Sequence, residues 1–401
     1  MQPARYIGLD IHKYYLIAVG VDADQNQVYG PKRVEWPDFE EWISKDLTNQ
    51  DSVVIEMTTN SWKTYDILVQ YVHSVTVVHP PYVSLVVRAR VKTDKKAALT
   101  LAQLHAAHLL PGIWIPPIEV RELRALVAQR RKMTILSSQA KNRLHAVLHR
   151  QQILPPPELE LFHSDLKDWW EGLNVSPIEK VRILSDLQTL EFAQKQKQLF
   201  EDYLRQMAAN DERVSFLIQI PGFGLINSMT VLGAIGDIRR FPDATKLVGY
   251  AGLGASVHAS GEQYTTGRIT KTGRRDLRAA MVEAANVAVQ HHVFWKKEFQ
   301  RMEMHLGRSK TVVAIARKLL ITVWNVLMKQ VADKHADARD VACSLFALAY
   351  RVKVRNLPNG VSAKQFVRNE LDRLGIGVDL QMIPWGTKQV KLPPSRLIMK
   401  L

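Results

Sequence analysis

Two long segments of helical periodicity dominate the middle of this sequence. From Glu119 to Gln152, apolar residues recur at spacings of three and four, and neither glycine nor proline interrupts them. This pattern predicts one long helix. The three prolines at positions 155–157 end it. A second periodic run from Ile178 to Ala209 predicts the returning arm of a helical hairpin or coiled coil. A chain of 401 residues is also too long for one core, which predicts two or three packed domains.

The region before the hairpin alternates extended and helical patterns. Three extended stretches between residues 5 and 36 predict an antiparallel meander, with polar turn residues at 22–27. The next segments predict a helix at 37–47, a buried strand at 52–56, a helix at 62–73 and a strand at 75–78. This order indicates an α/β domain with a mixed sheet, which ends at the prolines and the glycine of residues 111–117.

The region after the hairpin is punctuated by glycines and is mainly helical. Ile220–Gly224 resembles a helix-hairpin-helix turn, whose exposed amides can bind phosphate, although the same residues also suit an ordinary turn. Beyond Asp333 the long periodicity is lost, which predicts a small C-terminal appendage. The expected fold is therefore α/β plus all-α, divided into residues 1–116, 117–212, 213–333 and 334–401.

Charge indicates the kind of partner. The 401 residues carry 54 Lys and Arg against 39 Asp and Glu, a net charge of +15, which favours a polyanion, and nucleic acid before membrane. The single cysteine, Cys343, excludes an intramolecular disulfide and a thiolate metal site. The late apolar run 319–328 is about half the length of a membrane span. With no leader pattern at the start, we expect a cytoplasmic protein.

Cationic residues gather in two places. The loop after Tyr250 holds two hydroxyls, Ser256 and Ser260, and its cations suit a hydroxyl nucleophile that attacks a phosphodiester, or simply a loop that binds phosphate. The first arm of the hairpin is either a phosphate-binding face or a solvated one. The candidate nucleic-acid-binding residues are Arg121, Arg124, Arg130, Arg131 and Lys132 in the arm, and Arg268, Lys271, Arg274, Arg275 and Arg278 after the serines.

Three acidic residues occupy positions where a carboxylate needs an explanation. Asp10 lies within an apolar strand, Glu56 ends another strand, and Asp94 opens a helix. An Asp on the first strand, a Glu on a later strand and an Asp on a helix are typical of ribonuclease-H-like nucleases that bind two Mg²⁺ ions. The alternative, given equal weight, is that Asp10 caps a turn and Glu56 pairs with a lysine such as Lys13.

Several motifs together resemble the DEDD transposases of insertion sequence family 110, which are relatives of the Piv DNA invertases. The motifs are Gly8–Lys13, Val54–Glu56, Lys92–Ala98 and the segment Ile220–Arg278, and the resemblance covers roughly residues 5–330 in order. It implies a RuvC-like domain of ribonuclease-H type, a helical coiled-coil insertion and a transposase domain with a catalytic serine. It also implies recombination of donor and target DNA, guided by a structured bridge RNA, with Mg²⁺ as the cofactor.

The resemblance also assigns site residues. Asp10, Glu56 and Asp94 match the first three acids, which bind metal, and Ser260 matches the nucleophile better than Ser256 does. The sequence after Glu56, Met57-Thr58-Thr59, departs from the Ala-Thr-Gly of the family.

The fourth acid of the family is missing, because Ala97 stands at its position. Either the protein is impaired, or it uses a substitute ligand, or the chain was altered to stop catalysis. We expect nucleic-acid binding to survive and strand transfer to suffer.

Three functions remain open from the sequence: a recombinase with a phosphoserine intermediate, a RuvC-like structure-specific nuclease, and a non-catalytic nucleic-acid-binding protein. Because a nuclease needs no serine and a binding protein needs neither serine nor acids, the combination favours the recombinase. The long helices are expected to pair between chains, giving a dimer at least and a tetramer when two DNA molecules are joined.

Overall fold

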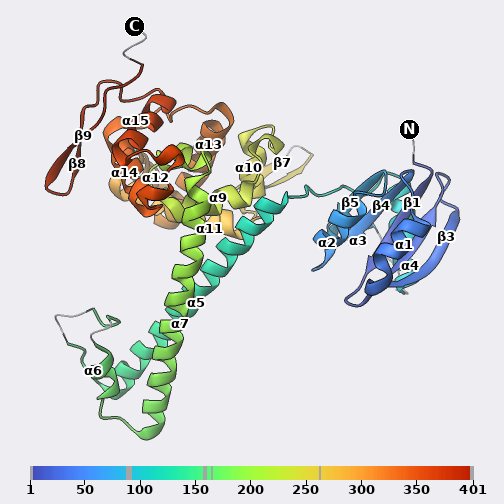
Figure 1. Ribbon diagram of the computed structural model, residues 1–401, viewed down its shortest axis with the longest axis horizontal. Helices are drawn as coiled ribbons and strands as arrows, with labels where there is room; N and C mark the ends of the chain where they lie inside the picture. The colour runs from blue at the N-terminus through green and yellow to red at the C-terminus, as the bar shows by residue number, and fades with distance from the viewer. Residues whose placement is uncertain (1–2, 87–92, 157–159, 164–165, 262, 398–401) are drawn as a thin grey trace. The chain divides into compact units, whose positions relative to one another are not determined.

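The protein divides into two compact units, residues 1–116 and residues 117–401. The structure is a computed structural model that describes residues 3–86, 93–156, 160–163, 166–261 and 263–397. The fold class expected from the sequence is confirmed, because the first unit contains a mixed sheet with helices and the second is mainly helical (Figure 1).

The first unit is built on a five-stranded sheet with the strand order β3-β2-β1-β4-β5. β1, β2 and β3 form the expected antiparallel meander, and β4 and β5 continue the sheet in parallel with β1. The strands are β1 (Arg5–Ile11), β2 (Tyr15–Val21), β3 (Gln27–Glu35), β4 (Asp51–Glu56) and β5 (Ser74–Val78).

Helices cover both faces of this sheet. Ile7 and Leu9 of β1 share a buried cluster with Trp42 of α1 and Leu68 of α2, whereas the opposite face packs against α4. The helix expected at 62–73 ends earlier, because turns after Leu68 lead the chain into β5. The helices are η1 (Trp36–Asp38), α1 (Phe39–Asp46), α2 (Ser61–Leu68), α3 (Pro80–Val86) and α4 (Asp94–Ala106).

The second unit begins with the long hairpin. Both predicted helices are present as α5 (Ile118–Gln151) and α7 (Pro177–Ala209), which lie side by side with the short α6 (Lys167–Glu171) near their distal end (Figure 1). Leu144 on α5 and Ile183 on α7 are fully buried in one cluster. Part of the apolar stripe on each helix therefore packs against the other helix within the chain.

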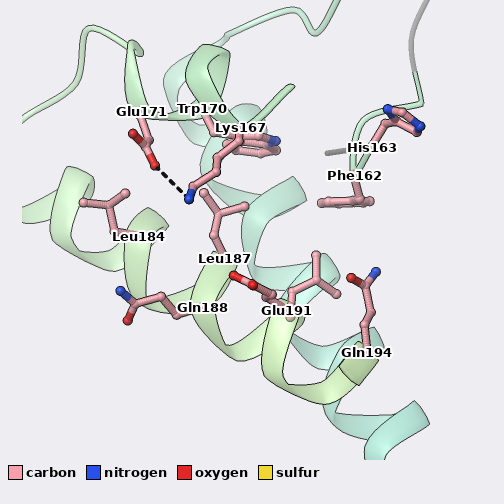
Figure 2. Close-up of a pocket in the computed structure, with 11 residues that line it drawn as sticks. Phe162, His163, Lys167, Trp170, Glu171, Leu184, Leu187, Gln188, Glu191 and Gln194 are labelled. Carbon is pink, nitrogen blue, oxygen red and sulfur yellow. Dashed lines mark ion pairs between the residues drawn. The ribbon is translucent and has the colours of Figure 1, made fainter. Parts of the chain in front are cut away.

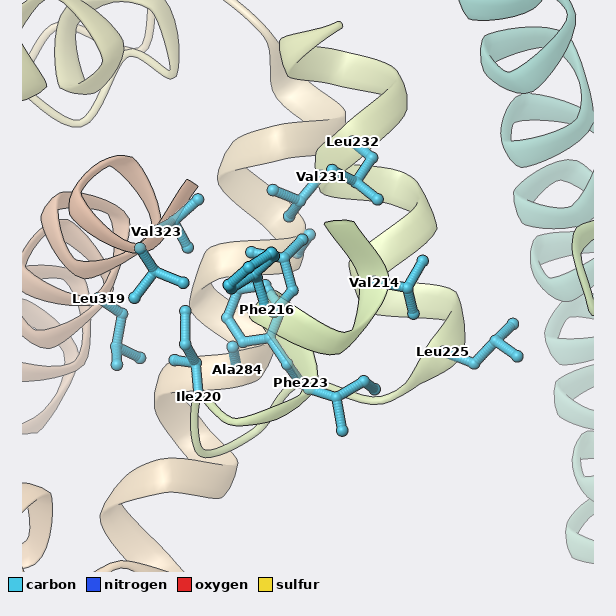
Figure 3. Close-up of a cluster of buried hydrophobic side chains, with 14 of the residues drawn as sticks. Val214, Phe216, Ile220, Phe223, Leu225, Val231, Leu232, Ala284, Leu319 and Val323 are labelled. Carbon is cyan, nitrogen blue, oxygen red and sulfur yellow. The ribbon is translucent and has the colours of Figure 1, made fainter. Parts of the chain in front are cut away.

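The rest of the second unit is a helical body with one β-hairpin. Figure 3 shows side chains from α8, α9, α11 and α13 meeting in its core, among them Phe216, Leu232, Ala284 and Leu319. The elements are α8 (Arg213–Ile218), α9 (Leu225–Ile235), η3 (Ile238–Arg240), α10 (Ala244–Tyr250), β6 (Ala255–Ser260), β7 (Gln263–Ile269), α11 (Arg275–His291), α12 (Val293–Leu306) and α13 (Arg308–Lys329). Among the described residues, α13 is long and apolar enough to cross a membrane, but its apolar face belongs to this core.

The C-terminal segment shares the same core. Leu345, Phe346 and Val367 are buried in one cluster with residues of α9, α11 and α13. Arg368, with 1% of its side chain exposed, donates hydrogen bonds to the carbonyls of Pro393 and Gly377. These bonds hold the segments around Pro393 and Gly377 against α15. The elements here are α14 (Ala338–Arg351), η4 (Val354–Asn356), η5 (Pro358–Gly360), α15 (Ala363–Leu374), β8 (Met382–Trp385) and β9 (Lys388–Lys391).

The turn between α8 and α9 faces inward. Ile220 and Phe223 are buried, and the Phe223 amide donates to the Ile220 carbonyl. Gly222 has φ +84°, and a Cβ there would lie 2.2 Å from the carbonyl oxygen of Ala284 on α11. The expected turn is present, and Gly222 allows it to pack closely against α11.

Candidate metal centre and nucleic-acid interface

The sheet register places two of the predicted acids side by side. β1 and β4 are parallel neighbours, with Leu9 opposite Ile55. Asp10 and Glu56 each follow one residue later, so they lie at the same level near the carboxyl ends of their strands. Because side chains alternate along a strand, both point to the face opposite Leu9 and Ile55, which is the face that α4 covers.

A glycine brings the third acid to this position. Gly8 lies two residues before Asp10, and a Cβ there would be 2.2 Å from the carbonyl oxygen of Ala98 on α4. The backbone of α4 therefore rests directly on β1. Asp94 is the first residue of α4, one turn before Ala98, and the Thr93 hydroxyl caps the helix by accepting from the Lys96 amide. Close packing at Gly8 thus sets where Asp94 lies.

Asp10 and Asp94 meet in a cluster that includes His12. One ligand atom from each of the three side chains lies within 4.8 Å of the others. His12 Nε2 is 3.2 Å from Asp10 Oδ2 and 3.4 Å from Asp94 Oδ2. The Tyr15 hydroxyl donates to Asp94 Oδ2 at 2.9 Å. Among the described residues, Glu56 is beside this cluster on β4 but is not part of it.

The sequence predicted the two aspartates but missed His12 and Tyr15. The available signal was local, because His12 stands two residues after Asp10 and a tight turn separates it from Tyr15. Neither residue lies on a periodic stripe, and so nothing in the pattern singled them out.

The cluster is electrostatically suited to a cation. Burial raises the pKa of the Asp10 carboxyl; His12 opposes that shift, and the charge of Asp94 adds to it. The hydrogen bond to Asp94 raises the pKa of the Tyr15 phenol, which remains a donor. Two carboxylate oxygens and one imidazole nitrogen form a donor set that fits a divalent cation, whose charge offsets the cost of holding the acids together.

The position expected for the fourth acid lies on the same helix. Ala97 follows Asp94 by nearly one turn, and its amide donates to the Thr93 carbonyl at 2.8 Å. Its methyl group provides no ligand atom. Lys92, the first residue of this motif, lies outside the described residues.

The two candidate serines occupy different places. The segment that the sequence suggested as a glycine-rich loop is instead an antiparallel hairpin of β6 and β7. Ser256 faces Gly267, where an added Cβ would lie 2.4 Å from its hydroxyl oxygen. Ser260 ends β6 opposite Gln263, next to Gly261 with φ +57°. The Ser260 side chain lies outside the part of the structure that is described.

Two of the cations that follow the serines support the protein itself. Arg278 donates to the Ala251 carbonyl at 2.8 Å, and Arg274 pairs with Asp276. The Arg278 bond joins the segment before β6 to α11, and the pair of Arg274 with Asp276 lies at the start of α11. Arg268, Lys271 and Arg275 are exposed and remain the candidates for phosphate contact.

The cations of α5 divide in the same way. Arg124 donates to the carbonyls of Gly233 and Ala234 at the end of α9, and burial lowers its pKa. Arg130 pairs with Glu201 of α7 at 2.9 Å, and Arg121 is half-buried. Arg131 and Lys132 are exposed. The sequence could not separate the two groups, because their roles depend on partners far along the chain.

A basic groove runs between α5 and α11. It consists of two adjoining hollows of about 440 and 650 Å³, which share Arg131, Ala279 and Glu283. The amides and hydroxyls of α9 and α11, such as Asn227 and Thr230, line it together with cations. The cations lining the groove are Arg130, Arg131, Lys271, Arg275 and Arg278.

A separate hollow lies at the distal end of the hairpin. Figure 2 shows it between α6, α7 and the residues Phe162 and His163. Its volume is about 360 Å³. Phe162 and the buried Trp170 line it, and Lys167 pairs loosely with Glu171 at 3.9 Å. These residues continue the core cluster that holds the hairpin tip together.

Comparison with known families agrees with this arrangement. Residues 7–153 match the DEDD transposase family of IS110 elements, and residues 214–301 match the transposase IS116/IS110/IS902 family. Together the two matches include the cluster of Asp10, His12 and Asp94 and the hairpin of β6 and β7. An α/β unit with a DEDD-type acidic centre, followed by this helical unit, defines a class of DNA transposases.

Relatives extend the match along most of the chain. The transposase for insertion sequence element IS1111A of Coxiella burnetii is 21% identical over 82% of this chain and 91% of its own length. The putative transposase y4qE of Sinorhizobium fredii is 24% identical over 69% of this chain and 70% of its own. The transposase for insertion sequence element IS1328 of Yersinia enterocolitica is 25% identical over 63% of this chain and 77% of its own length. The chain belongs to the IS110 family of transposases, enzymes that cut and join DNA.

Proposed function

We propose that this transposase exchanges DNA strands through a phosphoserine intermediate, with Ser260 as the nucleophile and with Asp10, Glu56 and Asp94 binding Mg²⁺. The observation that carries the proposal is the approach of Asp10 and Asp94 from β1 and α4, within a unit that matches the DEDD transposases. A divalent cation follows from that family, and Mg²⁺ is the ion that oxygen ligands favour.

The chemistry is two successive phosphoryl transfers. The Ser260 oxygen bonds to a DNA phosphorus as the bond from phosphorus to a sugar oxygen breaks, and the serine proton ends on the released sugar hydroxyl. A sugar hydroxyl of the other DNA then reverses the step, which frees the serine and joins the strands. The bound cation would stabilise negative charge on the phosphate oxygens. Asp10 and Asp94 would hold that cation, and Arg268 and Lys271 are our candidates for neutralising the phosphate.

The basic groove is proposed to bind nucleic-acid backbone. Its exposed cations, Arg131 and Arg275, lie along two long helices, a geometry that suits phosphates spaced along a strand. Backbone contacts carry no sequence information, so target choice is proposed to come from base pairing with a bridge RNA. Protein purified from its cellular host should carry a defined RNA. Nuclease-treated protein that still selected DNA by sequence would contradict this part.

A homo-oligomer is also proposed, because strand exchange between two sites needs several active centres. After α5 and α7 have packed together, α7 still presents a row of apolar side chains to solvent, with exposed fractions of 46–72%. A second copy of the hairpin would cover them. The residues in this row are Ile178, Val181, Phe192, Leu199 and Tyr203. Light scattering should show a dimer, and a tetramer with RNA and both DNA molecules; we propose that the assembly acts in the cytoplasm.

The serine assignment is tested by trapping the covalent intermediate. Ser260→Ala should abolish the protein–DNA adduct on a denaturing gel, and RNA binding should remain. Ser256→Ala is the matched control, since it removes a hydroxyl from the same strand. An adduct that survived Ser260→Ala but vanished in Ser256→Ala would move the nucleophile to Ser256. DNA cleavage with no adduct in either variant would instead identify a metal-dependent nuclease.

A further inference from the structure

We infer that His12 is a metal ligand of this centre and takes the place of the carboxylate that Ala97 lacks. The inference rests on the proposed function, in which the centre binds a divalent cation. It adds a residue that the pattern of four acids does not contain, and it gives this chain a mixed oxygen and nitrogen donor set.

The spacing of the three side chains fits coordination. Ligand atoms about 2.1 Å from an octahedral ion lie about 3.0 Å from their neighbours. His12 Nε2 lies 3.2 Å from Asp10 Oδ2 and 3.4 Å from Asp94 Oδ2. Small movements would bring one nitrogen and two oxygens around a common cation. Ala97, on the helix that carries Asp94, has no atom that could complete this set.

The imidazole is already oriented for this role. Its ring stacks on the Tyr15 ring, with 4.7 Å between centroids and 29° between planes. The His12 amide donates to the Tyr15 carbonyl, and the Tyr15 hydroxyl donates to Asp94. The Arg33 guanidinium lies 3.6 Å from the centroid of the Tyr15 ring. Tyr15 therefore positions both His12 and Asp94, as outer residues commonly do for metal ligands.

A nitrogen ligand changes which ion the centre prefers. Mg²⁺ favours oxygen donors, whereas imidazole also suits transition ions, and affinity at such sites rises along the divalent series. With His12 as a ligand, the centre should bind Mn²⁺ more tightly than Mg²⁺. A chain with a carboxylate in that place should discriminate less between the two ions.

The test measures Mn²⁺ bound to the full-length chain, without DNA and without turnover. Pulsed EPR should show a ¹⁴N coupling from an imidazole, and titration calorimetry should give the affinity. His12→Phe keeps a ring that can stack on Tyr15 but has no nitrogen. It should remove the coupling and weaken Mn²⁺ binding about tenfold or more. His73→Asn is the matched control, because His73 is exposed at the opposite end of the sheet, just before β5.

Two further variants keep the inference falsifiable if His12→Phe folds poorly. His12→Asp should bind metal with a lower ratio of Mn²⁺ to Mg²⁺ affinity than the parent. Ala97→Asp combined with His12→Phe should recover Mn²⁺ affinity, since it supplies the missing carboxylate.

The outcomes separate this inference from the function on which it rests. Mn²⁺ that binds without nitrogen coupling, and equally well to His12→Phe, would overturn the role of His12 and leave the metal centre intact. If the parent bound no Mn²⁺ or Mg²⁺, or if Asp10→Asn bound them equally well, the metal centre itself would be refuted, and the inference with it.

Discussion

The acidic cluster of the first unit and the basic groove of the second are assembled in different ways. Asp10 and Asp94 come together because two backbones touch, where Gly8 of β1 meets Ala98 of α4. The cations of the groove come from α5, from α11 and from the loop before α11, and two of them, Arg130 and Arg278, bond to protein groups. We therefore expect the loss of a single group to have a large effect in the first region. In the second region, where the cations are spread over a surface, we expect each residue to contribute little.

The largest effect is expected from the acidic cluster. Asp10→Asn removes a charge from the centre and should lower the rate of strand transfer about 10²- to 10³-fold, because transition-state charge loses its counter-ion. Nucleic-acid binding, measured by filter retention, should be unchanged. Asp24→Asn, at an exposed turn between β2 and β3, should have no effect on either measurement. Equal rates for parent and Asp10→Asn would remove the acidic cluster from catalysis.

The stability of the first unit should depend on pH. Burial, with a smaller contribution from His108, lowers the pKa of His105 on α4 to about 4, and its Nε2 lies 2.8 Å from the Ser52 hydroxyl. The unfolded chain takes up this proton near the ordinary value of 6.5. The contribution of neutral His105 to the free energy of unfolding is therefore fully present above pH 6.5. It is lost as the pH drops from about 6.5 to 4, which lowers the free energy of unfolding by on the order of 3 kcal/mol.

The variant His105→Gln should flatten this part of the stability curve, measured by urea unfolding at several pH values. His73→Gln, at an exposed site in the same unit, should leave the slope as it is. A parent chain whose stability did not change between pH 6.5 and 4 would show that His105 is not held neutral.

The contact at Gly8 should be sensitive to a single methyl group. Gly8→Ala places a Cβ 2.2 Å from the Ala98 carbonyl oxygen, so α4 must move, at a cost of about 1–3 kcal/mol in unfolding free energy. Metal affinity should fall as well, because Asp94 moves with α4. Gly249→Ala, where no atom lies within 4 Å of the added carbon, is the control. Unchanged metal binding in Gly8→Ala would separate the helix position from the site.

The smallest effect is expected in the basic groove, where two adjacent arginines make a matched pair. Arg131→Gln should weaken binding to duplex DNA severalfold without changing the melting temperature of the protein. The slope of log affinity against log salt concentration should become shallower by about one. Arg130→Gln should instead cost about 1 kcal/mol of stability or less, because it breaks the ion pair with Glu201. If both variants weakened binding equally, the division of cations by their contacts would be wrong.

The sequence could predict features that depend on neighbouring residues better than features that depend on distant ones. The ends of strands and the start of a helix follow from local pattern, so the sequence could place Asp10 and Glu56 on strands and Asp94 at a helix start. The partners of Arg124, in contrast, lie more than a hundred residues away, and no pattern reveals them. The packing of the C-terminal segment into the common core also depends on distant residues, such as those that surround Val367. His12 was missed because its role depends on a helix that begins 82 residues later.

The proposed strand exchange requires both the metal centre of the first unit and Ser260 of the second unit. The most direct measurement is mass-spectrometric mapping of the covalent DNA adduct, with its RNA and DNA present, in divalent metal or in chelator. We predict that the adduct maps to Ser260, requires metal, and is lost in Asp10→Asn. An adduct at Ser260 that formed equally in chelator, or in Asp10→Asn, would contradict the account.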